Sequence, residues 1–335
     1  MKKSIIKKIF IKLCKIMGYE IIDQNNFISP TLDKKLNEDL SILNNKSIIL
    51  PLGEVNITRK VKSILLLFRT NSNIEIWDQN KKRLFELPKI EYTLRSLNSL
   101  LKSIIFCKKK YPKIKIKLTV VEDNTDEINL NKIKNLINNS GLNADYESVD
   151  HQKYKQLIKE QKNEQTYSNL ASLLTCYKIA KKDADDLIFF VEDDYIHFEP
   201  MLEEMIASYE RISSQIKKEI FICPADYPYL YMNNNKTNVL IGNKRHWRTV
   251  EETLCTFMTS KELLETYWDN FYKTCLDRHD PFEKYINEIY KDEICISPLK
   301  SLSVHFTNIN SSYGLSPFID YQKLWDENEL KTPFF

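Results

Sequence analysis

Apolar runs of strand length alternate with segments of helical spacing along much of the chain. Residues 63–68 form a continuous apolar run, and a helical pattern with inward apolar positions follows over about 90–106. The same order recurs, with strands predicted over 114–121 and 145–149 and helices over 130–137 and 167–181. Strands that alternate with helices are typical of parallel sheets covered on both faces. The pattern therefore predicts an α/β fold with a mostly parallel central sheet and helices on both faces.

The next apolar run, residues 187–191, ends in three carboxylates, Glu192, Asp193 and Asp194. Acids that follow a buried strand lie at the sheet edge where open α/β folds bind ligands. Adjacent carboxylates attract a hard cation such as Mg²⁺ or Mn²⁺, which keeps some waters and bridges substrate phosphates. The run therefore predicts a metal site, and the alternative is a strand that ends in a solvated acidic turn.

Beyond the acids, strands are predicted over 219–223, 239–241, 245–250 and 253–258, and helices over 200–211, 261–274 and 281–290. Gly242 and Asn243 separate two of these strands and suit a hairpin turn. Ser260 is placed to cap the helix over 261–274, and Pro281 is placed to open the last one.

Glycine is too sparse for the loops that usually cradle phosphates. The five glycines are far apart in the sequence: Gly18, Gly53, Gly141, Gly242 and Gly314. A Walker A loop, a dinucleotide fingerprint and a Gly-x-Ser-x-Gly elbow all need glycines at short spacing. A nucleotide must therefore be held by side chains and a metal ion.

The composition limits the kinds of partner that the protein binds and the cellular compartment in which it is expected. The 335 residues include 49 Lys and Arg against 46 Asp and Glu, so the net charge of +3 gives no reason to expect nucleic-acid binding. The seven cysteines are odd in number and never spaced as Cys-x-x-Cys. They read as reduced core residues rather than a disulfide framework or a zinc site, which favours the cytoplasm.

Residues 1–20 differ from the rest because they carry six lysines and one acid, Glu20. Apolar residues recur there at helical spacing, at Ile5, Ile9, Leu13, Ile16 and Met17. The segment predicts a basic amphipathic helix on the inner face of an anionic membrane, and the alternative is a helix packed on its own domain. Its apolar stretches are too short to span a bilayer. Residues 21–62 are predicted to be a connecting region.

The polar residues at the strand ends resemble those of the GT-A glycosyltransferases, which use nucleotide-sugars. Arg69, Thr70 and Asn71 follow the first strand, residues 122–126 follow the second, and Glu192 to Asp194 follow the fourth. The second segment is similar to the Asp-Asp-Gly-Ser-x-Asp signature of the largest inverting family, with Asn124 in place of glycine. The third resembles the Glu-Asp-Asp form of the Asp-x-Asp motif in the animal Golgi N-acetylglucosaminyltransferase that starts complex N-glycans. The resemblance covers about residues 60–310.

This resemblance implies a GT-A sandwich over residues 63–310, with a nucleotide-sugar half (63–194), an acceptor half (195–310) and a C-terminal tail (311–335). It implies a nucleoside diphosphate-sugar donor, with a UDP-sugar as first choice, and a divalent Mn²⁺ or Mg²⁺ ion. Asp194 and His305 would ligate the ion, although His305 could instead be a core residue. The donor contacts would be Arg69, Thr70, Glu122, Asp123, Glu192 and Asp193.

An inverting transfer also needs a carboxylate that removes the proton of the acceptor hydroxyl. The resemblance implies a base just before a late helix, which makes Asp280 the first choice and Asp277 and Glu283 the alternatives. If none of them acts, a retaining mechanism stays open. Asp280 could equally cap that helix.

Arg245, Trp247 and Arg248 are predicted to bind the acceptor, since an indole stacks on sugars and arginine binds anionic oxygens. The alternative is a charged strand with Trp247 in the core. The sequence thus predicts a metal-dependent, inverting glycosyltransferase that acts on a glycan or lipid-linked acceptor in surface polysaccharide synthesis. Two alternatives stay open, a nucleotidyltransferase of the same sandwich class and a non-catalytic sugar-binding protein.

Overall fold

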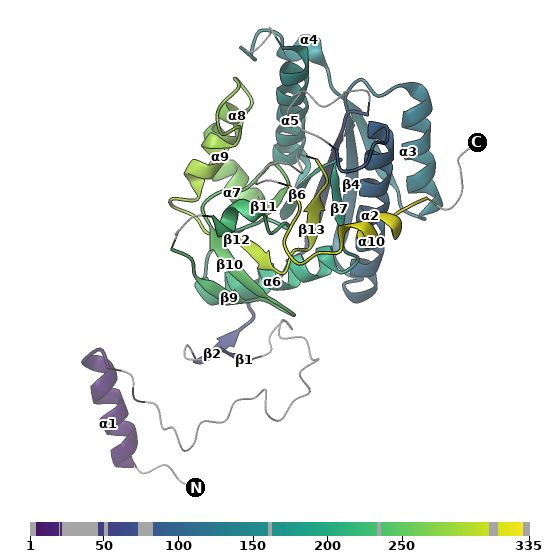
Figure 1. Ribbon diagram of the computed structural model, residues 1–335. Coiled ribbons are helices and arrows are strands. Elements are labelled where there is room, and N and C mark those ends of the chain that lie inside the picture. Colours follow the sequence, from purple (N-terminus) through teal and green to yellow (C-terminus); the bar gives the residue numbers. More distant parts are fainter. Residues whose placement is uncertain are drawn as a thin grey trace.

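The computed structural model describes residues 5–19, 21, 46–49, 53–72, 83–159, 163–232, 236–307 and 314–330. A nine-stranded sheet, in the order β5-β4-β3-β6-β11-β8-β12-β10-β9, forms its centre (Figure 1). The first four strands of this order run parallel, as predicted: β5 (Ala144–Ser148), β4 (Lys115–Glu122), β3 (Ser63–Thr70) and β6 (Leu187–Glu192). Their carboxyl ends therefore share one edge of the sheet.

The second half of the sheet is mixed. Its strands are β8 (Phe221–Ile222), β9 (Val239–Ile241), β10 (His246–Val250), β11 (Phe257–Ser260) and β12 (Cys295–Leu299). Strand β10 pairs antiparallel with β9, which confirms the predicted hairpin. The strand predicted over 253–258 begins only at Phe257. Before it, Thr253 N donates to the Asn287 side chain, and Thr256 contacts β6 through its side chain, whose Oγ1 accepts from Glu192 N.

Helices cover both faces of the sheet, which confirms the predicted α/β architecture (Figure 1). Side chains of β3 alternate between the faces, with Leu66 and Phe68 on one side and Leu65 and Leu67 on the other. The first face packs against α2 (Lys89–Lys110), α3 (Glu127–Asn139) and α6 (Met201–Ile216). The second packs against α4 (His151–Tyr154), α5 (Glu164–Asp183), α7 (Lys261–Thr266), α8 (Trp268–Thr274) and α9 (Lys284–Ile289). All seven cysteines are buried and unpaired, as predicted.

Two late helices differ from the predicted pattern. The helix expected over 261–274 is divided at Tyr267 into α7 and α8, although Ser260 caps it as predicted and accepts from Leu263 N at 3.2 Å. Pro281 does not open the last helix, because its carbonyl closes a separate turn with Lys284 N at 3.1 Å. Helix α9 begins at Lys284, so the predicted capping of this helix by Asp280 is wrong.

A small second sheet carries the end of the chain back to the domain. Strands β7 (Tyr195–His197) and β13 (Ser303–His305) pair antiparallel, with His305 opposite Tyr195. The predicted C-terminal tail contributes α10 (Tyr321–Asp326), whose Trp325 packs on Phe85 and Tyr92 at ring distances of 4.4 and 4.6 Å. The tail is therefore part of the core.

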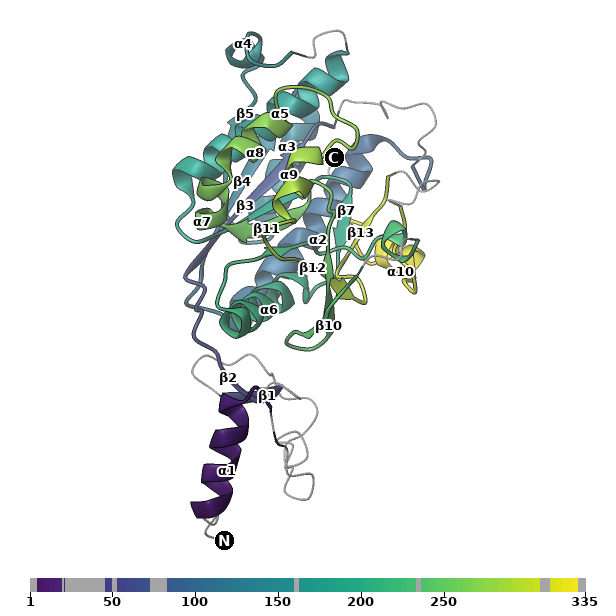
Figure 2. The same ribbon diagram turned by 90° about the vertical axis from the view of Figure 1, so that its left-hand side faces the viewer.

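The amino-terminal elements stand apart from the large sheet in two perpendicular views (Figures 1 and 2). Helix α1 (Ile5–Ile16) has the predicted position. An unpredicted hairpin, β1 (Lys46–Ile49) and β2 (Gly53–Asn56), lies within the predicted connecting region. Most of the rest of that region is outside the described residues. Among the helices that are described, none is long and apolar enough to cross a membrane.

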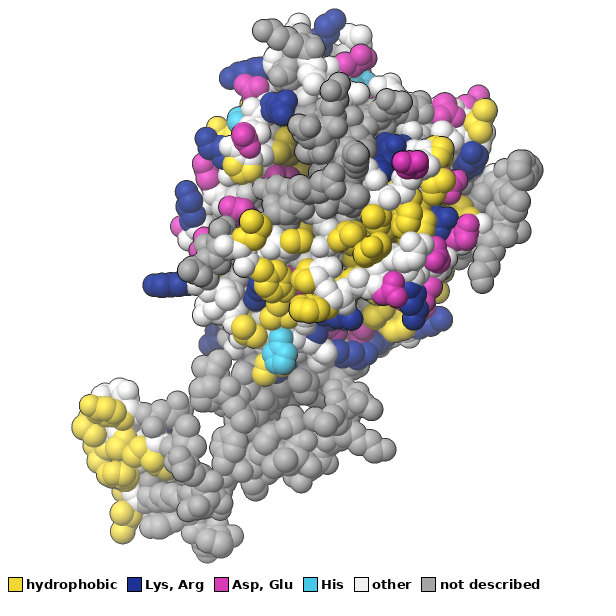
Figure 3. Space-filling model, in the orientation of Figure 1, with side chains coloured by type: hydrophobic (Ala, Val, Ile, Leu, Met, Phe, Trp, Pro, Cys, Tyr) yellow, Lys and Arg dark blue, Asp and Glu magenta, His cyan; other side chains and the backbone are white. Residues whose placement is uncertain are grey.

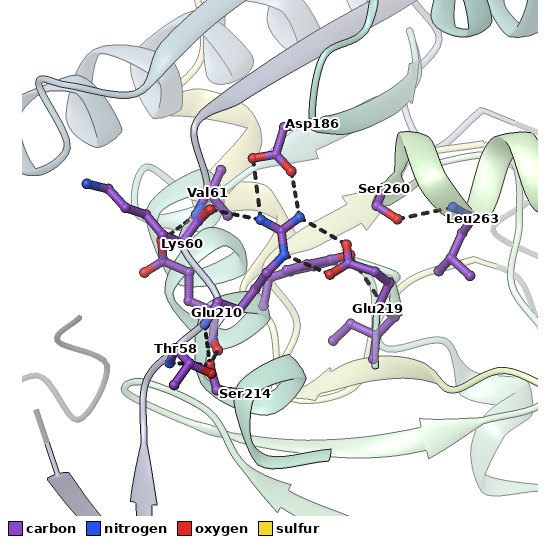
Figure 4. Close-up of polar contacts among 12 residues, drawn as sticks. Thr58, Lys60, Val61, Asp186, Glu210, Ser214, Glu219, Ser260 and Leu263 are labelled. Carbon is purple, nitrogen blue, oxygen red and sulfur yellow. Dashed lines mark hydrogen bonds and ion pairs between the residues drawn. The ribbon is translucent and has the colours of Figure 1, made fainter. Parts of the chain in front are cut away.

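Arg59 fixes the chain just before β3 through two carboxylates, Asp186 and Glu219, which are labelled in Figure 4. Its guanidinium bonds Glu219 at 2.7 and 2.9 Å and Asp186 at 2.5 Å. The backbone N of Arg59 donates to Ser214 Oγ at 2.8 Å. This cluster lies at the amino end of β3, so it holds the edge of the sheet opposite the acidic strand ends.

Candidate active site

Three parallel strands bring the predicted donor residues to one edge. Thr70 lies opposite Glu122 in the β3–β4 ladder, and Arg69 lies opposite Glu192 in the β3–β6 ladder. A cleft opens at this edge. Its lining residues come from these strands and from α2 and α5: Arg69, Thr70, Asn71, Lys89, Asp123, Gln165, Ser168, Asn169, Ser172, Glu192, Asp193 and Asp194.

Asp193 ties the start of α2 to the strand ends. Its Oδ2 accepts from Thr70 Oγ1 and Thr93 Oγ1, each at 2.8 Å, and its Oδ1 pairs with Lys89 Nζ at 2.5 Å. Burial works to lower the pKa of Lys89, but Asp193 and Asp194 outweigh it and raise that pKa. Lys89 is therefore a charged amine on the wall of the cleft. No local sequence pattern indicates this role for Lys89, because its partners lie more than a hundred residues away.

Glu192 forms an ion pair across the sheet with Arg69, at 2.5 Å. Arg69 also donates to the backbone oxygen of Asn169 in α5, at 3.2 Å. Burial raises the pKa of Glu192, with Asp194 adding to the effect and Arg69 opposing it. The arginine is thus held at the cleft by a carboxylate from the neighbouring strand.

Asp194 and His305 meet where β7 and β13 pair. His305 Nε2 lies 3.1 Å from Asp194 Oδ2, and the Tyr195 ring stacks on the imidazole at 4.7 Å. Burial works to raise the pKa of Asp194, but His305 and Lys89 hold it well below its usual range. His305 therefore lies beside the last of the three acids, and its role as a metal ligand stays a prediction.

One carboxylate oxygen of Asp194 does not take part in the contact with His305. Asp194 Oδ1 is buried and has no hydrogen-bond partner among the described residues. Within those residues no group of three or more His, Cys, Asp or Glu side chains is placed to hold a metal ion alone. Two protein ligands nevertheless fit a hard cation that takes its other oxygens from substrate phosphates and water. The unsatisfied Oδ1 is a suitable ligand for either Mg²⁺ or Mn²⁺, whereas the nearby imidazole suits Mn²⁺ better than Mg²⁺.

The two acids at the end of β4, Glu122 and Asp123, have different surroundings. Glu122 accepts from Ser148 Oγ in β5 and from Thr125 N, and it does not line the cleft. Asp123 does line it, held by His151 Nε2 at 2.5 Å and by Ser168. Asn124 has a φ of 54°, a left-handed conformation that asparagine tolerates. This explains how Asn124 can occupy the glycine position of the related signature.

The predicted acceptor-binding role of Trp247 is wrong. Its indole is fully buried in the core beneath Gly242, so no sugar can stack on it. Arg248 is also buried and pairs with Asp226, with its guanidinium 4.2 Å from the centre of the Tyr231 ring. Arg245 donates to the backbone oxygen of Lys300 at 2.6 Å. None of the three predicted acceptor residues lines the described cleft.

Two carboxyls near residue 280 have opposite environments. Asp280 is exposed. Glu283, one of its alternatives, is 9% exposed and lies 3.5 Å from Cys255 Sγ. Neither Asp280 nor Glu283 lines the described cleft. Burial, with a contribution from Glu192, raises the pKa of Glu283 to about 7. A buried carboxyl that is half ionised near neutral pH is typical of a general base.

The fold and the cleft together define an α/β sandwich with acids and paired cations at the carboxyl edge of its parallel strands, the arrangement that the GT-A resemblance implied. No family profile and no curated protein matches the sequence. Similar solved structures include TarS of S. aureus, with 13% identity and a TM-score of 0.34 over 61% of this chain. This chain spans 29% of that structure's length.

Two further similar structures have different activities. The galactosyltransferase LgtC, in complex with donor and acceptor sugar analogues, has 10% identity and a TM-score of 0.35 over 69% of this chain and 72% of its own. The UTP-bound UGPase from Acinetobacter baumannii has 8% identity and a TM-score of 0.43 over 82% of this chain and 95% of its own. Because these activities differ, the residues of this chain's own cleft must decide which reaction it supports.

Proposed function

We propose that this chain is a metal-dependent, inverting glycosyltransferase that moves a sugar from a nucleoside diphosphate-sugar, with UDP as first choice, to a glycan or lipid-linked acceptor. The observation that carries the proposal is the Asp194–His305 pair with its unsatisfied carboxylate oxygen. This pair ends a cleft that also presents the cations Arg69 and Lys89. We place the reaction in the cytoplasm, in the synthesis of a surface polysaccharide.

Asp194 Oδ1 and His305 Nε2 would hold the Mn²⁺ or Mg²⁺ ion, which when bound neutralises charge on the departing diphosphate. Lys89 and Arg69 add positive charge on the same wall, where phosphate oxygens bind well. Asp123 and Thr70 offer polar atoms to the nucleoside. Glu192 and Asp193 act through the cations that they hold in place.

Glu283 takes the proton of the acceptor hydroxyl in this proposal. A base works best when its pKa lies near the working pH, which suits a carboxyl with a pKa of about 7. The exposed Asp280 lacks such an environment, and so it is the weaker candidate. Arg248 would contact the acceptor in a second pocket, which is smaller than the cleft and which it lines with Tyr229 and Lys236.

A thermal-shift panel of UDP, GDP, CMP and UDP-sugars, with and without Mn²⁺, tests the donor site. A ligand at a hundredfold its dissociation constant adds about 2.7 kcal/mol to the stability of the folded state. We expect one nucleotide to raise the melting temperature only with metal, and we expect Asp194→Asn to abolish that increment. Asp145→Asn is the matched control, because Asp145 is exposed in β5, pairs with the exposed Lys117 at 2.9 Å and does not line the cleft.

The outcomes separate the candidate functions. If no nucleotide stabilises the protein under any metal condition, the glycosyltransferase proposal fails. Stabilisation by UTP with release of pyrophosphate from a sugar phosphate would indicate the nucleotidyltransferase instead. Metal-independent sugar binding that survives Asp194→Asn would indicate a sugar-binding protein.

A further inference from the structure

Helix α1 carries an apolar stripe that nothing described in the domain covers. Its large side chains are mostly exposed: Ile6 78%, Ile9 55%, Phe10 57%, Leu13 52%, Ile16 75% and Met17 63%. They recur every three or four residues, so they share one side of the helix. Figure 3 shows this stripe as a continuous apolar patch on α1. So much exposed apolar surface on one short helix marks an interaction site.

Positive charge accompanies the stripe. Lysines occupy positions 2, 3, 7, 8, 12 and 15, and no acid occurs before Glu20. Lys12 and Lys15 are exposed. Positions 8, 12 and 15 are spaced by four and three residues, so they share a second side of the helix, which adjoins the stripe. The helix therefore has an apolar side and a basic side.

Three partners could cover such a stripe, and two of them fit poorly. In both perpendicular views the helix stands away from the sheet of its own domain (Figures 1 and 2). A second copy of α1 would bring the same lysines and no acid to pair with them, so like charges would repel. Twelve residues are also too few for the three or four heptads of a stable coiled coil.

We propose that α1 docks on the surface of an anionic lipid bilayer. The apolar stripe would enter the boundary between headgroups and acyl chains while the lysines contact anionic headgroups. The helix lies in the plane of the surface, since it is too short to cross the bilayer. This proposal does not depend on the reaction that the domain catalyses.

Co-flotation of the full chain with vesicles tests the proposal. We expect binding to phosphatidylcholine vesicles that contain phosphatidylglycerol, weak binding to phosphatidylcholine alone, and weaker binding as salt is raised. Leu13→Glu places a charge in the stripe and should lower anionic-vesicle binding by roughly tenfold or more. Lys12→Glu with Lys15→Glu should lower it through charge alone.

Ile128→Glu is the matched control, because Ile128 is 72% exposed on α3 and lies outside α1. Its binding to vesicles should equal that of the unmodified chain, and all variants should keep the melting temperature. Equal binding to neutral and anionic vesicles, no binding to either, or binding unchanged by Leu13→Glu would each overturn the proposal. So would a dimer in solution that dissociates on Leu13→Glu, because a second copy would then be the partner.

Discussion

Glu283 lies in a buried environment that disfavours its ionised form. Its pKa of about 7 lies above the ordinary 4.5 of a glutamate because burial and Glu192 disfavour the ionised form. The folded state therefore holds the proton more tightly, and stability falls as the pH rises from about 4.5 to 7. Such a cost is typical of a site that serves function rather than folding.

Glu283→Gln should consequently stabilise the protein while it abolishes transfer. At pH 8 the neutral amide avoids the cost of the buried charge, so we expect a gain of about 1 to 3 kcal/mol in the free energy of unfolding. The gain should vanish near pH 4. Urea denaturation at both pH values measures it, and Glu262→Gln, at an exposed position, should change neither stability nor rate.

The residues that carry recognisable chemistry could be predicted from the sequence, and those that only support them could not. Asp194 and His305 stood out because an acidic strand end and a late histidine have a meaning in the GT-A resemblance. Lys89 and Thr93 are ordinary helix residues until the fold brings them to Asp193. Trp247 was misjudged because its strand shows no clear alternation, so the sequence did not tell which side faces the core.

At the scale of elements, the turn between β9 and β10 is as tightly packed as the core. A Cβ atom at Gly242 would overlap the indole of Trp247 and the hydroxyl of Ser208. The indole is fully buried and so has little room to move. Glycine at this turn is therefore needed for close packing rather than for an unusual backbone conformation.

Gly242→Ala should lower the free energy of unfolding by about 1 to 3 kcal/mol, the usual cost of overpacking. The midpoint of urea unfolding measures this loss. Val239→Ala in the same hairpin is the control, because Val239 is 59% exposed and its truncation should cost much less. Equal losses for the two variants would contradict the packing argument.

Elements with a strong apolar period were predicted to within a few residues. The parallel strands β3 and β6 contain continuous apolar runs, which leave little choice of structure, and β4 ends in a buried segment after alternating Lys with apolar residues. The hairpin of β1 and β2 was missed because its short apolar run, residues 48–52, is interrupted by Pro51 and lies in a region that is otherwise rich in Asn, Lys and Ser. The start of α9 was missed because an Asp-Pro pair is a general signal for a helix start, which here is used by a turn.

At the scale of the whole molecule, the end of the chain supports the active site. Trp325 of α10 contacts Phe306 at a ring distance of 5.3 Å, and Phe306 follows His305 in the sequence. The Arg95 guanidinium lies 4.5 Å from the centre of the same indole ring and donates a hydrogen bond to the backbone oxygen of Trp325. Residues 321–326 thus brace the strand that carries His305.

Trp325→Ala should therefore reduce both stability and nucleotide binding. Removing a buried indole costs about 3 to 5 kcal/mol, which the urea midpoint measures. Because His305 loses its support, the metal-dependent increment in melting temperature should also shrink. Tyr321→Ala, on the same helix but 37% exposed, should leave that increment intact.

The Arg59 cluster also determines how the molecule bears a mechanical load. A pull through the chain that joins α1 to the domain meets the contacts of Thr58 and Arg59 before it reaches β3. That strand is paired in parallel on both sides, with β4 from Ser63 to Thr70 and with β6 from Ile64 to Arg69. A force along a strand loads all the hydrogen bonds of both ladders at once, in shear, instead of opening them one by one. If α1 holds the domain at a bilayer, a force on the connecting chain thus acts along β3. This is the direction in which the hydrogen bonds of both ladders share the load.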